Sequence, residues 1–245
     1  MLNILKFDFY KLTHSKTLKY VFLVSILLCC VNPIIIIIQN NGHSVLSYMF
    51  SINILELILL IFVPIFITID FSNGFIKNNI SYINKFYYVL SKIFYIGVYT
   101  LLMFIISFIL TAFAILVING GMLYNSYDSF PIGGWIYNRL FFLGFLFALG
   151  LLCMLVSFLI RKNYIVIGAF LIYLSFLSYP FYQLLNSIKY GITDYMLLGN
   201  LDYFSVVREW QMVWTTDYTI RLVILIVLII FTTILSLLCF KKRGF

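Results

Sequence analysis

Charged side chains are scarce in this chain. Of its 245 residues, 16 are Lys or Arg, 8 are Asp or Glu and 2 are His, whereas 64% are hydrophobic. Soluble domains usually carry about 25% charged residues. The 10% found here therefore excludes an ordinary soluble domain and indicates an integral membrane protein.

The motifs that mark common enzyme classes are missing too. The sequence contains no HExxH pair, no GxSxG nucleophile elbow and no GxxxxGK[ST] phosphate loop. We therefore expect a chain that is not an enzyme, carries no cofactor and does not bind ATP in the P-loop manner. All four cysteines lie in apolar runs, where Cys packs as a small hydrophobe, so we expect neither a disulfide scaffold nor a metal site. They are Cys29, Cys30, Cys153 and Cys239.

Long apolar runs occupy most of the sequence. At about 1.5 Å rise per residue, each run is long enough as a helix to cross a hydrocarbon core of roughly 30 Å. We therefore predict an all-α, polytopic membrane protein forming one transmembrane domain over residues 1–245, with six transmembrane helices. The predicted spans cover residues 20–38, 46–69, 93–118, 136–160, 164–182 and 219–240.

Basic residues fall mostly on one side of these spans. Short loops rich in Lys and Arg stay in the cytoplasm, so both termini are predicted to be cytoplasmic. The predicted inner set is Lys6, Lys11, Lys16, Lys19, Lys77, Lys85, Lys92, Arg161, Lys162, Lys241, Lys242 and Arg243, and the outer set is Arg139, Lys189, Arg208 and Arg221. The basic residues lie at helix ends and form no stripe on a soluble face, so the +8 charge indicates contact with anionic lipid headgroups and no nucleic-acid partner.

Three segments outside the spans have helical patterns. Residues 1–19 place Leu2, Leu5, Phe9 and Leu12 at helical spacing, which favours a helix in the cytoplasmic interface over an extension of the first span. Residues 72–92 carry a second apolar stripe and predict a cytoplasmic amphipathic region. Residues 183–218 predict interfacial or re-entrant helices on the outer side, because aromatic side chains favour the membrane–water interface. The aromatic residues that carry this prediction are Tyr203, Trp210 and Trp214.

Glu56 is the one acidic residue well inside a predicted span. A carboxylate near mid-bilayer costs about 3 kcal/mol, so it rarely faces lipid and often marks a substrate path or a subunit interface. The alternative is a hydrogen-bonded or protonated Glu that fixes helix packing. Both interpretations stay open on the sequence.

A local motif resembles a known family. The run Asp70-Phe71-Ser72-Asn73-Gly74-Phe75-Ile76-Lys77-Asn78, followed by Ser91-Lys92, is similar to a pattern in permease subunits of ABC exporters of the second type. That pattern has an acidic residue, a glycine, Lys-Asn and then Ser-Lys opening the third helix. Phe75 departs from it, since Thr is common there, and so does the pair Asn84-Lys85, where Ser-Arg is usual. Within the family, the chain resembles small bacterial permeases that export peptides, including bacteriocin-immunity and phenol-soluble-modulin exporters.

The resemblance implies a function and partners. It implies a permease subunit in a bacterial cell membrane that pairs with a second permease chain, identical or homologous, and with two copies of a cytoplasmic ATPase that binds ATP and Mg²⁺. It also implies that residues 73–85 couple the permease to the ATPase, through Asn73, Gly74, Ile76, Lys77, Ile80, Ile83 and Lys85. The substrate would be an amphipathic peptide or a similar hydrophobic molecule. The alternatives are a stand-alone secondary carrier or immunity protein using Glu56 and, more remotely, an intramembrane enzyme.

Overall fold

The structure is a computed structural model of the whole chain, and it describes residues 2–31, 34, 52–72, 84–118, 132–172, 192–205 and 216–242. Every regular element in these ranges is helical, as the sequence predicts. The elements are α1 Leu2–His14, α2 Lys16–Cys29, α4 Ile52–Ser72, α6 Lys85–Ile118, α7 Ile132–Ile160, α8 Asn163–Ile172, the short 3₁₀ helix η3 Ile192–Tyr195, α10 Leu197–Ser205 and α11 Thr216–Lys242.

Four of these helices are long and apolar enough to cross a membrane: α4, α6, α7 and α11. The pair α1 and α2 adds a fifth if the two bent helices count as one span. The chain is therefore a multi-pass membrane protein with four to five candidate spans among its described residues. Six spans remain a prediction, because α8, in the predicted fifth span, is only ten residues long and residues 173–182 lie outside the described ranges.

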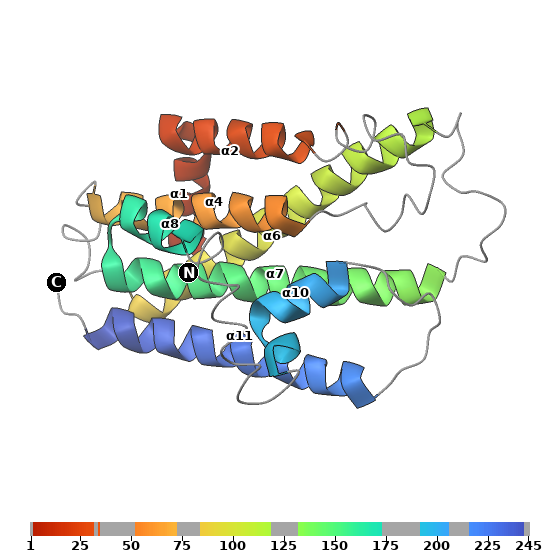
Figure 1. The fold of residues 1–245 in the computed structure, drawn as a ribbon. Helices are drawn as coiled ribbons and strands as arrows, with labels where there is room; N and C mark the ends of the chain where they lie inside the picture. Colours follow the sequence, from red (N-terminus) through yellow and green to blue (C-terminus); the bar gives the residue numbers. More distant parts are fainter. Residues whose placement is uncertain are drawn as a thin grey trace.

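The core of the fold is α7, which packs against α4, α6, α8, α10 and α11. Figure 1 shows it in the middle of the bundle, between α4 and α11, with α6 crossing obliquely. Of the residues in the apolar stretch of each helix, 67% are buried in α4 and 56% in α7, whereas only 11% are buried in α11. The outward face of α11 is apolar and therefore suited to contact lipid.

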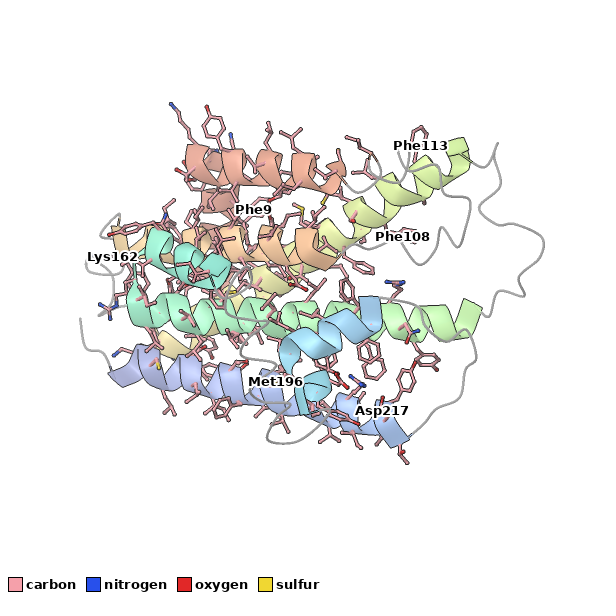
Figure 2. The ribbon with its side chains drawn as sticks, viewed as in Figure 1. Phe9, Phe108, Phe113, Lys162, Met196 and Asp217 are labelled. Atoms are coloured by element: carbon pink, nitrogen blue, oxygen red, sulfur yellow. The ribbon has the colours of Figure 1, made fainter. Side chains whose placement is uncertain are left out.

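The helices alternate in direction, so one end of the bundle gathers the ends of α4, α7 and α11 and the start of α6 (Figure 1). Lys85 begins α6 and Lys242 ends α11 at this end, and Figure 2 labels Lys162 there, between α7 and α8. The described basic residues at these helix ends thus lie together, as the predicted cytoplasmic side requires. We call this the basic end of the bundle.

Ser15 separates α1 from α2. Its backbone is extended, with φ −72° and ψ 121°, and its Oγ accepts a hydrogen bond from the backbone N–H of Leu18 at 3.5 Å. Ser is a favoured N-cap because its side chain satisfies a free N–H of the first turn. A new helix starts after this residue, and α2 leaves α1 at 70°.

Asn84 sets the start of α6 in the same way. Its Oδ1 accepts a hydrogen bond from the N–H of Phe86 at 3.0 Å. The helix therefore begins at Lys85, before the predicted span at residue 93, and the last residues of the predicted cytoplasmic region belong to α6. The hydropathy pattern stops at Lys92 because a lysine normally ends an apolar run, but Lys92 is 0% exposed here.

Two glycines of α7 let neighbouring helices approach closely. A Cβ added at Gly150 would lie 2.8 Å from Cγ2 of Ile96 on α6, and one at Gly144 would lie 2.7 Å from Cδ2 of Leu225 on α11. Ile96 is β-branched and stiff at χ1, whereas the end of a Leu side chain moves more easily. An added methyl group is therefore harder to accommodate at Gly150 than at Gly144.

We predict that Gly150→Ala lowers stability by about 1–3 kcal/mol through overpacking against Ile96. The matched control is Gly168→Ala on α8, where an added Cβ meets nothing within 4 Å and the loss of a helical glycine costs nothing. Thermal unfolding in detergent measures both. Equal melting temperatures for the two variants would contradict the predicted close approach of α6 and α7.

Candidate functional site

Four charged side chains are buried together at the basic end of the bundle. Asp8 and Lys11 come from α1, Asp70 from the end of α4 and Lys92 from α6, and their exposed fractions are 0%, 9%, 1% and 0%. Lys11 Nζ lies 2.6 Å from Asp70 Oδ1, and Lys92 Nζ lies 2.6 Å from Asp70 Oδ2. Lys92 also pairs with Asp8, which is 3.6 Å from Lys11. We call these four residues the buried charge cluster.

The cluster balances its own charge, because two carboxylates face two ammonium groups. Burying a lone charge costs several kcal/mol, so four charges remain buried only when each meets an opposite charge and further hydrogen bonds. Lys11 Nζ also donates to the carbonyl of Phe66 at 2.9 Å. Both ammonium groups lie over the Phe66 ring, Lys11 at 4.2 Å and Lys92 at 4.5 Å from its centroid.

Hydroxyl groups of α6 complete the carboxylate contacts. Tyr88 Oη donates to Asp70 Oδ2 at 2.8 Å, and Ser91 Oγ donates to Asp8 Oδ2 at 2.6 Å. One helical turn beyond Ser91, Tyr95 Oη donates to the carbonyl of Leu5 at 2.8 Å, which fixes α1 on α6 a second time. The cluster therefore ties α1, α4 and α6 together through their side chains.

Aromatic contacts extend this junction to the remaining spans. The Tyr88 ring stacks on Phe240 of α11 with centroids 4.8 Å apart, and it contacts Phe158 of α7 at 6.4 Å. Phe158 also meets Phe71, the residue after Asp70, edge to face. At the basic end, α4, α6, α7 and α11 are thus connected through a few buried side chains.

Of the predicted coupling residues, only Lys85 is among the described residues. Asn73, Gly74, Ile76, Lys77, Ile80 and Ile83 lie outside the described residues, as do Trp210 and Trp214. Lys85 is half-buried at the first position of α6. Residues 73–83 therefore join two helices, α4 and α6, whose facing ends carry Asp70, Tyr88 and Lys92.

Glu56 is in a different part of the molecule. It lies in the second turn of α4 and is 4% exposed, so it faces the protein interior as expected of an intramembrane carboxylate. Asp70 is fourteen positions after Glu56, which corresponds to roughly 21 Å along a helix. Glu56 is not part of the buried charge cluster.

A second polar cluster holds the segment formed by η3 and α10 against α11. Arg221 Nη1 donates to the carbonyl of Asp194 at 2.9 Å and to Asn200 Oδ1 at 2.7 Å, and its Nε donates to Asp217 at 2.8 Å. Arg221 is 3% exposed, so it turns into the protein and does not extend toward the surface. Hydrogen bonding to Asp217 raises the pKa of Tyr195, whose ring lies 5.0 Å from the Arg221 guanidinium.

The predicted outer segment folds back onto the spans in its described part. The helix α10 packs on α7 and α4 and meets α11 through the hydrogen bond between Asn200 and Arg221, and its Asn200, Leu201 and Phe204 are completely buried. Tyr203 belongs to this helix. A re-entrant or interfacial position relative to a membrane stays a prediction for this segment.

The buried charge cluster was not predicted from the sequence. Lys11 and Lys92 are predicted only as members of the inner basic set, and Lys92 also as part of the Ser-Lys pair of the motif. A detectable sign was present, because Asp8 and Lys11 are three residues apart and Asp70 and Lys92 end apolar runs on the same predicted side. Only the bend at Ser15, which the sequence pattern does not specify, directs the polar face of α1 inward.

Among the described residues, no group of three His, Cys, Asp or Glu could hold a metal ion.

We predict that Lys11→Met lowers the free energy of unfolding by about 3–5 kcal/mol, because it leaves a net charge of −1 among buried groups. The matched control on the same helix is Lys6→Met, since Lys6 is exposed and should change stability by no more than about 0.5 kcal/mol. Thermal unfolding in detergent measures both. Adding Asp8→Asn to Lys11→Met restores neutrality and should recover part of the loss; no recovery would show that packing, not charge balance, sets the effect.

Comparison with known proteins adds no relative. No protein-family model matches the chain, and no curated protein matches it in sequence. The arguments about its function therefore rest on its own residues and on their arrangement.

Proposed function

We propose that this chain is the membrane-spanning permease subunit of an ATP-driven ABC exporter in a bacterial cell membrane. It moves an amphipathic peptide or a similar hydrophobic substrate outward. ATP and Mg²⁺ bind to two copies of a separate cytoplasmic ATPase, and a second permease chain, identical or homologous, completes the transporter. The observation that carries the proposal is the buried charge cluster on both sides of residues 73–83.

The proposed coupling to the ATPase is mechanical. A permease without an ATP site receives its driving force through a cytoplasmic contact with the ATPase, and that contact must move the spans as rigid bodies. Residues 73–83 connect the end of α4 to the start of α6. Asp70 lies just before this segment and is bound to Tyr88 and Lys92 just after it. A displacement of the segment therefore carries both helices along together.

The cluster also transmits this movement to α1 and α11. Lys11 joins α1 to Asp70, and Tyr88 stacks on Phe240 of α11. Separating any buried ion pair leaves uncompensated charge at a cost of about 3–5 kcal/mol. The helix ends consequently move as one unit, and a contiguous set of packed side chains of this kind is a physical route for coupling.

The second candidate is a stand-alone carrier or immunity protein that uses Glu56. The observation that favours it is the burial of Glu56 within α4, because buried intramembrane carboxylates often lie on substrate or proton pathways. This candidate needs no ATPase and leaves the charge cluster with a purely structural role. The two candidates therefore differ in the partner that they require.

The first test is co-purification with candidate ABC ATPases. We predict that each of three changes to an acidic residue, Ile76→Asp, Lys77→Glu and Ile80→Asp, reduces the amount of ATPase recovered with the chain at least tenfold. The control is Lys162→Glu, an exposed basic residue at the same end of the bundle but outside residues 73–83. Unchanged ATPase recovery and unchanged transport in the three variants would exclude this segment as the coupling element.

The second test separates the two candidates. Glu56→Gln keeps the size and hydrogen-bonding capacity of the side chain and removes its charge. For a permease driven by ATPase contact, we predict normal expression, normal ATPase recovery and transport within about twofold of the parent. Abolished transport at normal expression, combined with full activity of the variants at residues 76, 77 and 80, would favour the carrier instead.

A further inference from the structure

A cavity of about 640 Å³ lies between α4, α7, α8, α10 and α11. Its described lining is apolar except for Tyr195 and includes Leu60 of α4, Leu152 of α7 and Ile224 of α11. Ligand cavities in proteins usually measure about 300–1,000 Å³ and are lined mainly by apolar side chains. The size and the lining therefore both suit an apolar guest. We call this space the α7–α10 cavity.

The cavity runs along α7 and borders an exposed residue of α8, which suits an elongated guest that enters from the bilayer. Along α7 the lining extends from Leu149 to Val156, which corresponds to roughly 10 Å of helix. Apolar cavities stay dry and bind apolar molecules, so water is a poor occupant. The wall on α8 includes Ala169, which is exposed, so the cavity borders a surface that faces lipid in a membrane. An alkyl chain fits this shape and this route.

One end of the cavity carries an acidic rim. Tyr195 and Met196 line the cavity, and Asp194 is the neighbouring residue in η3. Arg221 holds this segment on α11 and is itself bound to Asp217. Figure 2 labels Met196 and Asp217 on this side of the bundle, where the start of α10 lies near α11. Among these described groups, two carboxylates face one guanidinium, which leaves a net charge of −1.

The accessible part of the rim is negative. The side chain of Asp217 is 30% exposed and Asp194 is exposed, whereas the side chain of Arg221 is 4% exposed. These carboxylates, beside the lining residue Tyr195, are therefore more accessible to a ligand than the guanidinium. A cationic group complements this surface and an anionic group does not.

We propose that the α7–α10 cavity binds one alkyl chain of an amphiphile whose ammonium headgroup lies against Asp194 and Asp217. The described lining belongs to a single chain and includes no member of the buried charge cluster. This binding site therefore goes beyond the proposed function and holds for a permease and for a carrier alike. A phospholipid with an ammonium headgroup and a free alkylammonium molecule share this chemistry.

The experiment is native mass spectrometry of the purified full-length chain in maltoside detergent, titrated with hexadecyltrimethylammonium. The parent should bind one molecule saturably. Ile224→Trp fills the cavity and should reduce that binding at least tenfold. The matched control is Val223→Trp, the neighbouring residue, which is 52% exposed and does not line the cavity, and it should bind like the parent. Equal binding by the two Trp variants would overturn the cavity assignment.

A second variant protects the test against misfolding. Ala169→Phe narrows the cavity from α8, and it should reduce binding in the same way while the chain elutes and melts like the parent. Full binding by a folded Ala169→Phe chain, together with full binding by Ile224→Trp, would place the amphiphile elsewhere. The mass of any ligand that the parent retains through purification, and that Ile224→Trp lacks, tells a phospholipid from a free amphiphile.

A separate binding experiment tests the headgroup. Asp194→Asn removes one rim carboxylate and leaves the backbone carbonyl that Arg221 binds. It should weaken hexadecyltrimethylammonium binding about two- to fivefold, as expected for an exposed ion pair, and leave binding of uncharged hexadecanol unchanged. Equal affinity of the parent for hexadecyl sulfate and for the ammonium probe would overturn the assignment of a cationic headgroup.

Discussion

The structure depends on four charges that are buried only because they neutralise one another. Asp8, Lys11, Asp70 and Lys92 come from three helices, and each carboxylate pairs with an ammonium group from another helix. Removing any one member leaves a net charge in a site of low dielectric, where the cost is several kcal/mol. The position of α1 on the bundle, the start of α6 and the end of α4 are therefore set together. That joint constraint is what makes the basic end of the molecule suited to receive a force.

The opposite part of the fold uses the same principle with a different residue. Arg221 is buried by its contacts with Asp217, Asn200 and the carbonyl of Asp194, and it fixes η3 and α10 on α11. Each polar cluster thus attaches a peripheral helix to the bundle, α1 in one case and α10 in the other. Between them the bundle is held by apolar packing around α7 and by close approaches such as that at Gly150. Polar contacts decide where the peripheral helices sit, and apolar contacts decide how tightly the spans pack.

The α7–α10 cavity follows from this arrangement. Because Arg221 holds α10 across α7 and α11, the short helix covers the space between α4, α7 and α8 without filling it. An apolar space with a polar group at one end is a property of the assembled helices and of none of them alone. Its described lining includes no member of the buried charge cluster, so the proposed ligand and the proposed ATPase contact involve different residues of the bundle.

The sequence by itself determined the membrane environment, the helical class and the approximate positions of α4, α6, α7 and α11, because hydropathy is a local property that needs no partner. It also marked Glu56 as an interior carboxylate. The tertiary structure decided which charged residues are buried and with whom. Asp8 and Lys11 occupy the polar face of α1, and only the 70° bend at Ser15 and the docking of α1 on α6 bring that face to Asp70 and Lys92. Pairing between residues more than fifty positions apart depends on packing geometry, and periodicity along one helix carries no information about it.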